Sequence, residues 1–172
     1  NQATGEWTIG FFENFAVYQC RFWDYESIQI KKDETVVKLK NNTTRLTLSL
    51  KHKNRASCNI AFGKDNPQKY ILCNGKHLPD YPLTDTTPFI DNGYRTDSVT
   101  LTGYLRNLPS SRPFDVSIPD MITGKEEKYQ TDIDSLGRFT LRFPVLNSHN
   151  VFIDWGRTTI WSAVEPGETY FL

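Results

Sequence analysis

Short runs of residues that favour β-strands follow one another along almost the whole chain, separated by turn-forming residues. Two of these runs, Thr35–Lys40 and Arg45–Leu50, alternate or nearly alternate between apolar and polar residues, as half-buried strands do. The polar loop Asn41–Thr44 between them is typical of a hairpin. Only Gly10–Tyr18 also fits a short helix, because some of its aromatic residues recur at helical spacing. The strands expected in this part of the chain are Trp7–Tyr18, Phe22–Ile30, Thr35–Leu39, Arg45–Leu50, Ser57–Phe62 and Lys69–Leu72.

The amino-acid composition also favours β-structure. The 11 Phe, 8 Tyr and 4 Trp against a single Met suit pleated, half-buried surfaces better than helical bundles.

The charge of the chain argues against two classes of partner. Twenty basic residues balance 20 acidic ones, so no long-range field attracts nucleic acid or an anionic membrane. No segment approaches the roughly 20 apolar residues that a membrane-spanning helix needs. We therefore expect no nucleic acid partner and no transmembrane segment.

A change of composition between Asn74 and Ser98 indicates a domain boundary, because Gly, Pro, Asp and Thr dominate there and prolines interrupt strand pairing. We assign residues 1–85 to an N-terminal antiparallel β-meander or barrel-like sheet, 86–98 to a linker and 99–172 to a small Ig-like β-sandwich. The strands expected in the sandwich are Val99–Leu105, Phe114–Ile118, Lys128–Ile133, Arg138–Val145, Val151–Trp155, Thr158–Val164 and Thr169–Leu172.

The clearest turn signal lies between Asp134 and Gly137. Asp134 suits the first position of a type I turn, since its carboxylate can accept bonds from the backbone ahead of it. Gly137 suits the left-handed position that closes the hairpin, where a Cβ is disfavoured. We therefore expect Gly137→Ala to cost about 1 kcal/mol or more.

A second turn signal, Gly156–Arg157, predicts a two-residue loop that joins the strands on either side of it. In that register Phe152 lies directly across from Trp161, on the face that water should reach. An exposed aromatic pair tends to associate with other apolar surfaces. We therefore expect it to be covered by the N-terminal domain or a neighbouring strand, by a missing C-terminal domain or partner, or by a stacked ligand. Of these we predict the domain interface, with Trp161 mostly buried and Trp161→Ala lowering stability by a few kcal/mol. The opposite, core face would carry Val151, Ile153, Trp155, Ile160 and Val164.

The three cysteines, Cys20, Cys58 and Cys73, form no C-x-x-C pair and have no neighbouring histidine at ligand spacing, so no metal site is predicted. If Phe62 pairs with Lys69 in a hairpin, Cys58 lies opposite Cys73. A disulfide between these two is then one interpretation, and two buried thiols is the other. Cys20 would be the remaining, buried cysteine.

No catalytic, cofactor-binding or metal-ligating residue is predicted. The histidines His52, His77 and His149 lie in no recognisable motif, and two of them sit in polar loops. The carboxylates of Glu13, Asp24 and Glu26 lie near aromatic residues, as in a glycosidase cleft, but solvent-facing strand positions account for them more simply. No glycine-rich phosphate loop occurs.

Several segments together carry a family resemblance: Lys76–Pro82, Asp91–Asp97, Val99–Gly103, Thr131–Leu141, Ile153–Thr158 and Pro166–Tyr170. They resemble the β-domain region that precedes the thioredoxin module in Bacteroides-type exported thiol–disulfide exchange proteins. The likeness runs from about Trp7 to Leu172 and includes no C-x-x-C redox motif. It implies a location in the periplasm or cell envelope, often with a lipid anchor, and it supplies no catalytic residue.

From these observations we expect a non-enzymatic accessory or docking module of an exported envelope protein, without a cofactor. Its partner would be a protein, either its own C-terminal domain or another envelope component. The alternatives are a β-sandwich module that binds a glycan or another small ligand, and a hydrolase. The chain starts without an initiator methionine or signal sequence and stops on the apolar run Glu168–Leu172, so we expect it to be a piece of a longer protein.

Overall fold

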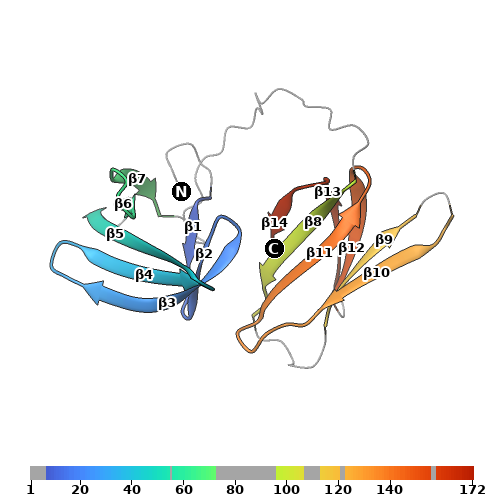
Figure 1. Cartoon of the computed structure of the whole chain (residues 1–172), viewed down its shortest axis with the longest axis horizontal. Coiled ribbons are helices and arrows are strands. Elements are labelled where there is room, and N and C mark those ends of the chain that lie inside the picture. Colours follow the sequence, from blue (N-terminus) through green and yellow to red (C-terminus); the bar gives the residue numbers. More distant parts are fainter. Residues whose placement is uncertain (1–6, 55, 73–95, 107–112, 121–122, 156–157) are drawn as a thin grey trace, which may run out of the picture. The chain divides into compact units, whose positions relative to one another are not determined.

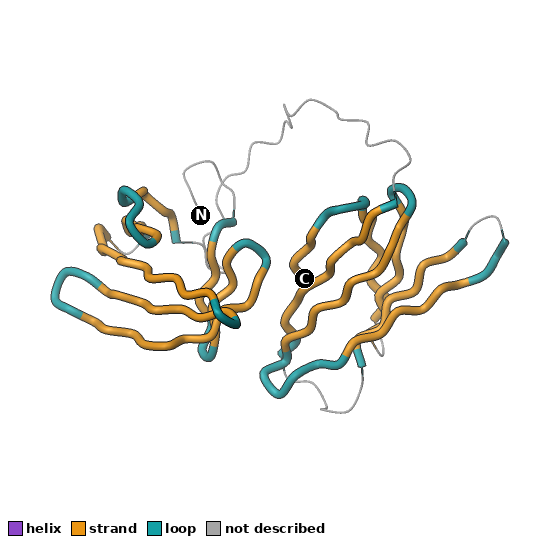
Figure 2. Tube along the Cα trace, in the orientation of Figure 1, coloured by secondary structure: helices purple, strands orange, loops and turns teal. Residues whose placement is uncertain are grey.

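The computed structural model is an all-β protein that divides into two compact units, residues 1–87 and 88–172 (Figure 1). It describes residues 7–54, 56–72, 96–106, 113–120, 123–155 and 158–172. These residues form strands and loops and contain no helix (Figure 2), which confirms the all-β prediction. The division between the units falls inside the segment 86–98 that the composition assigns to a linker.

The first unit is one antiparallel sheet in which every strand pairs with the next along the chain, as a meander does. Two of its hairpins turn on two-residue loops, Gln19–Cys20 and Asn42–Thr43. Gln19, Cys20 and Asn42 have φ angles of 51°, 52° and 50°, which suit tight hairpin turns. The strands are β1 (Ile9–Phe11), β2 (Phe15–Tyr18), β3 (Arg21–Ile30), β4 (Thr35–Asn41), β5 (Thr44–Asn54), β6 (Ser57–Phe62) and β7 (Gln68–Ile71).

The run Trp7–Tyr18 is a hairpin, neither one continuous strand nor a helix. β1 pairs with β2, and the Phe12 amide donates to the Phe15 carbonyl oxygen at 2.9 Å across the turn. The consecutive residues of β2 from Phe15 to Val17 are all buried. Burial on both faces of one strand explains why the aromatic spacing that fits a helix did not produce one.

The sheet of the first unit curls into a half-barrel, as the barrel-like prediction requires. Tyr18 on β2 stacks on Phe62 of β6 with ring centroids 4.8 Å apart, although β3, β4 and β5 lie between them in the sheet. Bulges at Tyr25/Ser27 and His52/Asn54 increase the local twist that allows this curl. The buried residues inside it are Ala16, Trp23, Val37, Leu39, Leu48, Ile60 and Tyr70.

The second unit is a β-sandwich, which confirms the predicted architecture. One sheet has the order β10-β9-β12-β13 and the other β11-β8-β14. The described pairs are antiparallel except β8 with β14, which run parallel. The strands are β8 (Asp97–Tyr104), β9 (Phe114–Pro119), β10 (Glu126–Thr131), β11 (Arg138–Val145), β12 (His149–Trp155), β13 (Thr158–Val164) and β14 (Thr169–Phe171).

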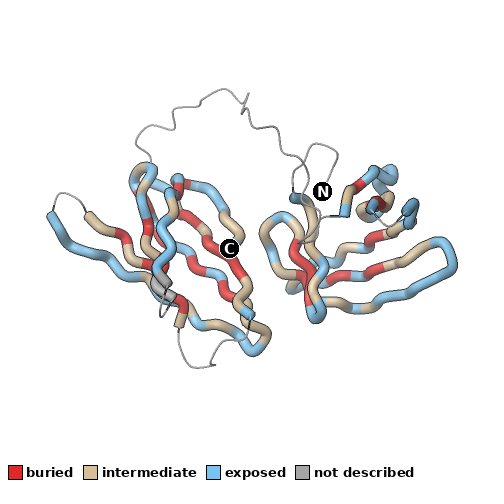
Figure 3. The backbone as a smooth tube through the Cα atoms, turned by 180° about the vertical axis from the view of Figure 1, so that it is seen from behind, coloured by how far each residue is buried: buried red, intermediate tan, exposed pale blue. Residues whose placement is uncertain are grey.

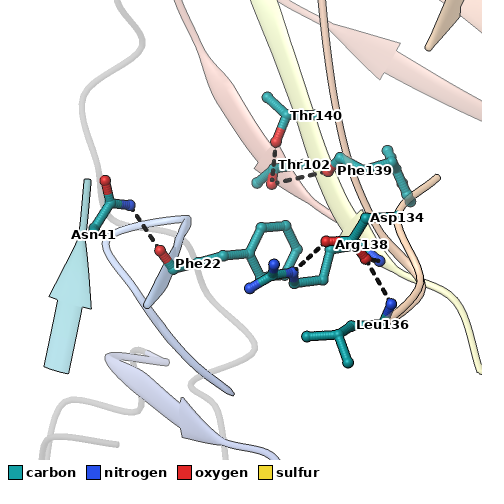
Figure 4. A network of polar contacts seen from close by, with 8 residues as sticks. All are labelled: Phe22, Asn41, Thr102, Asp134, Leu136, Arg138, Phe139 and Thr140. Atoms are coloured by element: carbon teal, nitrogen blue, oxygen red, sulfur yellow. Dashed lines mark hydrogen bonds and ion pairs between the residues drawn. The ribbon is translucent and has the colours of Figure 1, made fainter. Parts of the chain in front are cut away.

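Buried residues recur along the strands of both sheets of the sandwich, as the red segments in Figure 3 show, and their side chains form a single apolar cluster. Phe114 of β9 stacks on Phe139 of β11 with ring centroids 3.8 Å apart. On the opposite face of β8 from this cluster, Thr102 is a buried polar residue that lies across from Thr140, and its hydroxyl donates to the Phe139 carbonyl oxygen at 3.3 Å (Figure 4). The fully buried members of the cluster include Val99, Leu101, Phe114, Val116, Phe143, Val151, Ile153 and Val164.

The predicted turn at Asp134 and Gly137 forms with the expected bonds. The Gly137 amide donates to the Asp134 carbonyl oxygen at 2.9 Å, and Gly137 has a φ of 82°. The Asp134 carboxylate accepts from the amides of Leu136 and Arg138, both at 2.9 Å, and from Arg138 Nε at 2.7 Å (Figure 4). The turn does not close a hairpin, however, because β10 and β11 belong to different sheets. It is the corner at which the chain crosses the sandwich.

We expect Gly137→Ala to destabilise the protein more than Gly124→Ala does. Both glycines have positive φ, so each substitution carries a conformational cost of about 1 kcal/mol. A Cβ at Gly137 would also lie 2.2 Å from the Leu105 carbonyl oxygen, whereas one at Gly124 meets nothing within 4 Å. Moving that backbone adds roughly 1–3 kcal/mol. Urea unfolding measures both variants, and equal losses would contradict this account of the corner.

The stability contributed by Asp134 is expected to depend on pH. Burial tends to raise its pKa, but the hydrogen bonds from Arg138 and Leu136 outweigh this and hold the pKa below the usual aspartate value. Such a group stabilises the fold above its unfolded pKa of about 3.9, and the effect is lost as the pH falls through the lower folded value. The difference in unfolding free energy between wild type and Asp134→Asn should therefore be larger at about pH 7 than at about pH 2.

Urea titrations at the two pH values measure this difference. Asp132→Asn, at an exposed position two residues earlier, is the matched control. A difference for Asp134→Asn that stays constant with pH would show that the carboxylate charge does not stabilise the corner.

Candidate interaction surface

The predicted register of the hairpin formed by β12 and β13 is confirmed. Trp155 pairs with Thr158, and Phe152 pairs with Trp161. Gly156–Arg157 lies outside the described residues, but the ladder on both sides of it has the register that a two-residue loop produces. The aromatic pair is therefore positioned by the turn signal read from the sequence.

The Phe152 and Trp161 rings contact each other edge to face, with centroids 4.5 Å apart and an interplanar angle of 77°. Trp161 is nevertheless 72% exposed, so the prediction that it is mostly buried is wrong. Two features explain this exposure. β13 is the last strand of its sheet, and Trp161 points to the face opposite the core residue Val164.

The aromatic pair ends a row of residues that crosses the whole four-stranded sheet. Lys128 of β10 lies opposite Ser117 of β9, and Ser117 lies opposite Phe152 of β12. Lys128 is exposed and Ser117 is partly exposed. We call these four residues, Lys128, Ser117, Phe152 and Trp161, the outer-face row. It offers a cation, a hydroxyl and two aromatic rings along one line.

Asp115 adds an acceptor next to the outer-face row. It lies on the same face as Ser117, two residues earlier on β9, and its register partners are Gln130 and Asp154. Its Oδ1 atom is buried and has no hydrogen-bond partner among the described residues. An unpaired buried acceptor costs about 1–3 kcal/mol, so Asp115 lowers the stability of this sheet.

Some of the residues predicted to form the core face of the same hairpin are buried. Val151, Ile153 and Val164 are buried, whereas Ile160 is 47% exposed. The burial of the Trp155 side chain lies outside the described residues. Ile160 is exposed because it sits on the edge strand, and the facing sheet has three strands against four.

The cysteines differ from expectation. β6 and β7 pair with Cys58 opposite Tyr70, so the predicted register of Phe62 with Lys69 is wrong and does not place Cys58 opposite Cys73. Cys58 carries a free thiol, and Cys73 lies outside the described residues. Cys20 is partly exposed rather than buried, because it occupies the turn between β2 and β3. Burial raises the pKa of both described thiols, which makes them poorer nucleophiles.

The described polar residues resemble a solvated surface more than a reaction centre. His52 is exposed, and Glu26 is an exposed carboxylate that accepts a hydrogen bond from Arg45 Nε at 2.9 Å, which lowers its pKa. No group of three or more His, Cys, Asp or Glu side chains in the described part of the chain could hold a metal ion. His77 lies outside the described residues.

No family model, curated protein or solved structure matches this chain, so the comparisons supply no function for the outer-face row. Over the residues that the structure describes, there is no helix of the length and apolar character needed to cross a membrane.

We expect Trp161→Ala to lower the free energy of unfolding by only about 1 kcal/mol, the value of an aromatic pair beyond its buried area. Phe143→Ala is the matched core control, because its ring is 1% exposed, and it should cost roughly 3–5 kcal/mol. Urea unfolding of both variants gives the comparison. A loss at Trp161 as large as that at Phe143 would mean that the indole is covered in solution.

Proposed function

We propose that this chain is a non-catalytic docking module of an exported envelope protein, and that the outer-face row receives a protein partner. The observation that carries the proposal is Trp161, a large aromatic side chain 72% exposed yet held in place by Phe152. Tryptophan is among the residues that contribute most binding energy at protein interfaces.

The surroundings of the aromatic pair support a protein partner. Interfaces typically combine an aromatic centre with a polar rim. Here Lys128 and Ser117 extend from the pair across the sheet, and the unpaired Asp115 oxygen lies beside them. A partner that brings an apolar group to Trp161 and polar groups to Ser117 and Lys128 would match this surface.

The proposed setting is the periplasm or cell envelope. It rests on the resemblance of the sequence to the β-domains of exported thiol–disulfide exchange proteins. In that setting the module would hold a thioredoxin-like redox domain, its own or a partner's, near the proteins it acts on. The partner class is therefore a protein with a C-x-x-C thioredoxin-type domain.

A glycan is the second candidate ligand. Trp161 is exposed beside the uncharged polar residue Thr159, and aromatic rings bordered by hydroxyl groups are suited to stacking on sugars. A glycan array probed with wild type and with Trp161→Ala tests this candidate. Binding that the variant loses would favour the glycan over the protein.

Photo-crosslinking in the native cells tests the protein partner. A photoreactive residue at Lys128, at the far end of the outer-face row, should capture a protein with a thioredoxin-type C-x-x-C domain. Adding Trp161→Ala should reduce this product about tenfold or more, the loss expected when an interface anchor worth 1.4 kcal/mol or more is removed. Mass spectrometry identifies the captured protein.

The control places the same photoreactive group at Arg142, an exposed position on β11 of the other sheet. Equal capture at both positions, or no thioredoxin-type protein among the products, would overturn the docking proposal. Fractionation of the same cells tests export, which cytoplasmic recovery of the protein would contradict.

A further inference from the structure

Strand β13 is an edge strand without the usual protection against pairing. Among the described strands it pairs with β12 alone, so its other side presents backbone donors and acceptors. The strand Thr158–Val164 contains no charged residue, no proline and no glycine, and its seven pairs with β12 continue without a bulge. Such a long, regular, uncharged edge is a template for another strand.

The other described edge strands are each protected. β10 carries Glu126, Glu127 and Lys128, and β11 carries two arginines and Pro144. β14 and β1 have three residues each, and β7 has four with one lysine. Charge, proline and shortness are the devices by which natural sheets avoid pairing at their edges. The contrast singles out β13.

The residues of β13 fit a second copy of the same strand. Trp161 is the central residue of the seven, so the antiparallel register that pairs all seven positions sets Trp161 against its counterpart in the other copy. Opposed residues in an antiparallel pair share a face, so both sandwich cores stay on one side of the joined sheet. With no charge on either edge, no like charges meet.

We propose that two copies of this chain associate through antiparallel pairing of their β13 strands about Trp161. The two four-stranded sheets then form one continuous sheet, with the two outer-face rows meeting end to end. Aromatic pairs across strands stabilise such a ladder. The pairing is symmetric and uses the β13 edge of each copy. No β13 edge is then left for a third copy, so the association closes at a dimer.

Charge substitutions at Thr159 and Ala163 test the pairing and its register. Both residues are exposed on the outer face, and each lies opposite the other across the proposed dimer axis. In the dimer, position 159 of each copy faces position 163 of the other. The double variant Thr159→Lys/Ala163→Lys therefore creates two pairs of opposed positive charges, and Thr159→Glu/Ala163→Glu creates two pairs of opposed negative charges. Each should raise the dimer Kd by roughly tenfold or more. An equimolar mixture should restore the dimer, because each lysine then faces a glutamate.

Analytical ultracentrifugation over a concentration series measures the association of each protein. The matched control, Gln130→Lys/Ser135→Lys, adds two charges at exposed positions away from β13 and should leave the Kd unchanged. Circular dichroism melts verify that every variant is folded. Trp161→Lys and Trp161→Glu, alone and mixed, give a second test at the centre of the ladder if a double variant fails to fold.

Three results would overturn the proposal: a monomeric wild type up to roughly 0.1 mM, a dimer that the charged variants do not weaken, or a mixture that does not reassociate. Fibres instead of dimers would also overturn it, since they would show open-ended pairing. The proposed docking function is tested separately, because a monomeric wild type leaves the capture of a partner at Lys128 unaffected.

Discussion

Burial of one apolar layer between two sheets is the constraint on which the second unit depends. On β11 the residues Phe139, Leu141, Phe143 and Val145 face this layer while the residues between them face outward. The two-residue period of a strand decides which side chains enter the core and which meet water. The corner at Asp134 serves the same layer, because it carries the chain from one sheet to the other.

The unequal widths of the two sheets explain why the hairpin of β12 and β13 is the unusual part of the sandwich. Four strands face three, so the fourth strand is incompletely covered even on its inner side, where Ile160 is 47% exposed. On the outer side Trp161 has Phe152 as its ring partner and is otherwise exposed to water. The proposed docking surface and the proposed dimer both follow from this edge. One uses the outer face of the hairpin, and the other uses its unpaired backbone.

Local elements could be predicted closely from the sequence. The bounds of Ser57–Phe62, Arg138–Val145 and Thr158–Val164 are those of the observed strands. The register of Phe152 with Trp161 was also predictable, because a two-residue loop leaves little freedom to the strands that it joins. The register of Cys58 was not, since the longer loop between β6 and β7 permits several alignments, and Tyr70 occupies the position opposite it.

The strand pattern, the two-unit organisation and the placement of an aromatic pair on the outer face of a hairpin could all be predicted from the sequence alone. These depend on alternation and turn chemistry, which act between residues close together in the chain. The exposure of Trp161 and the role of the turn at Asp134 as a link between two sheets depend instead on how the strands pack. Burial depends on which distant strands cover a residue, and the second sheet packs against the inner face of β13, whereas Trp161 lies on its outer face.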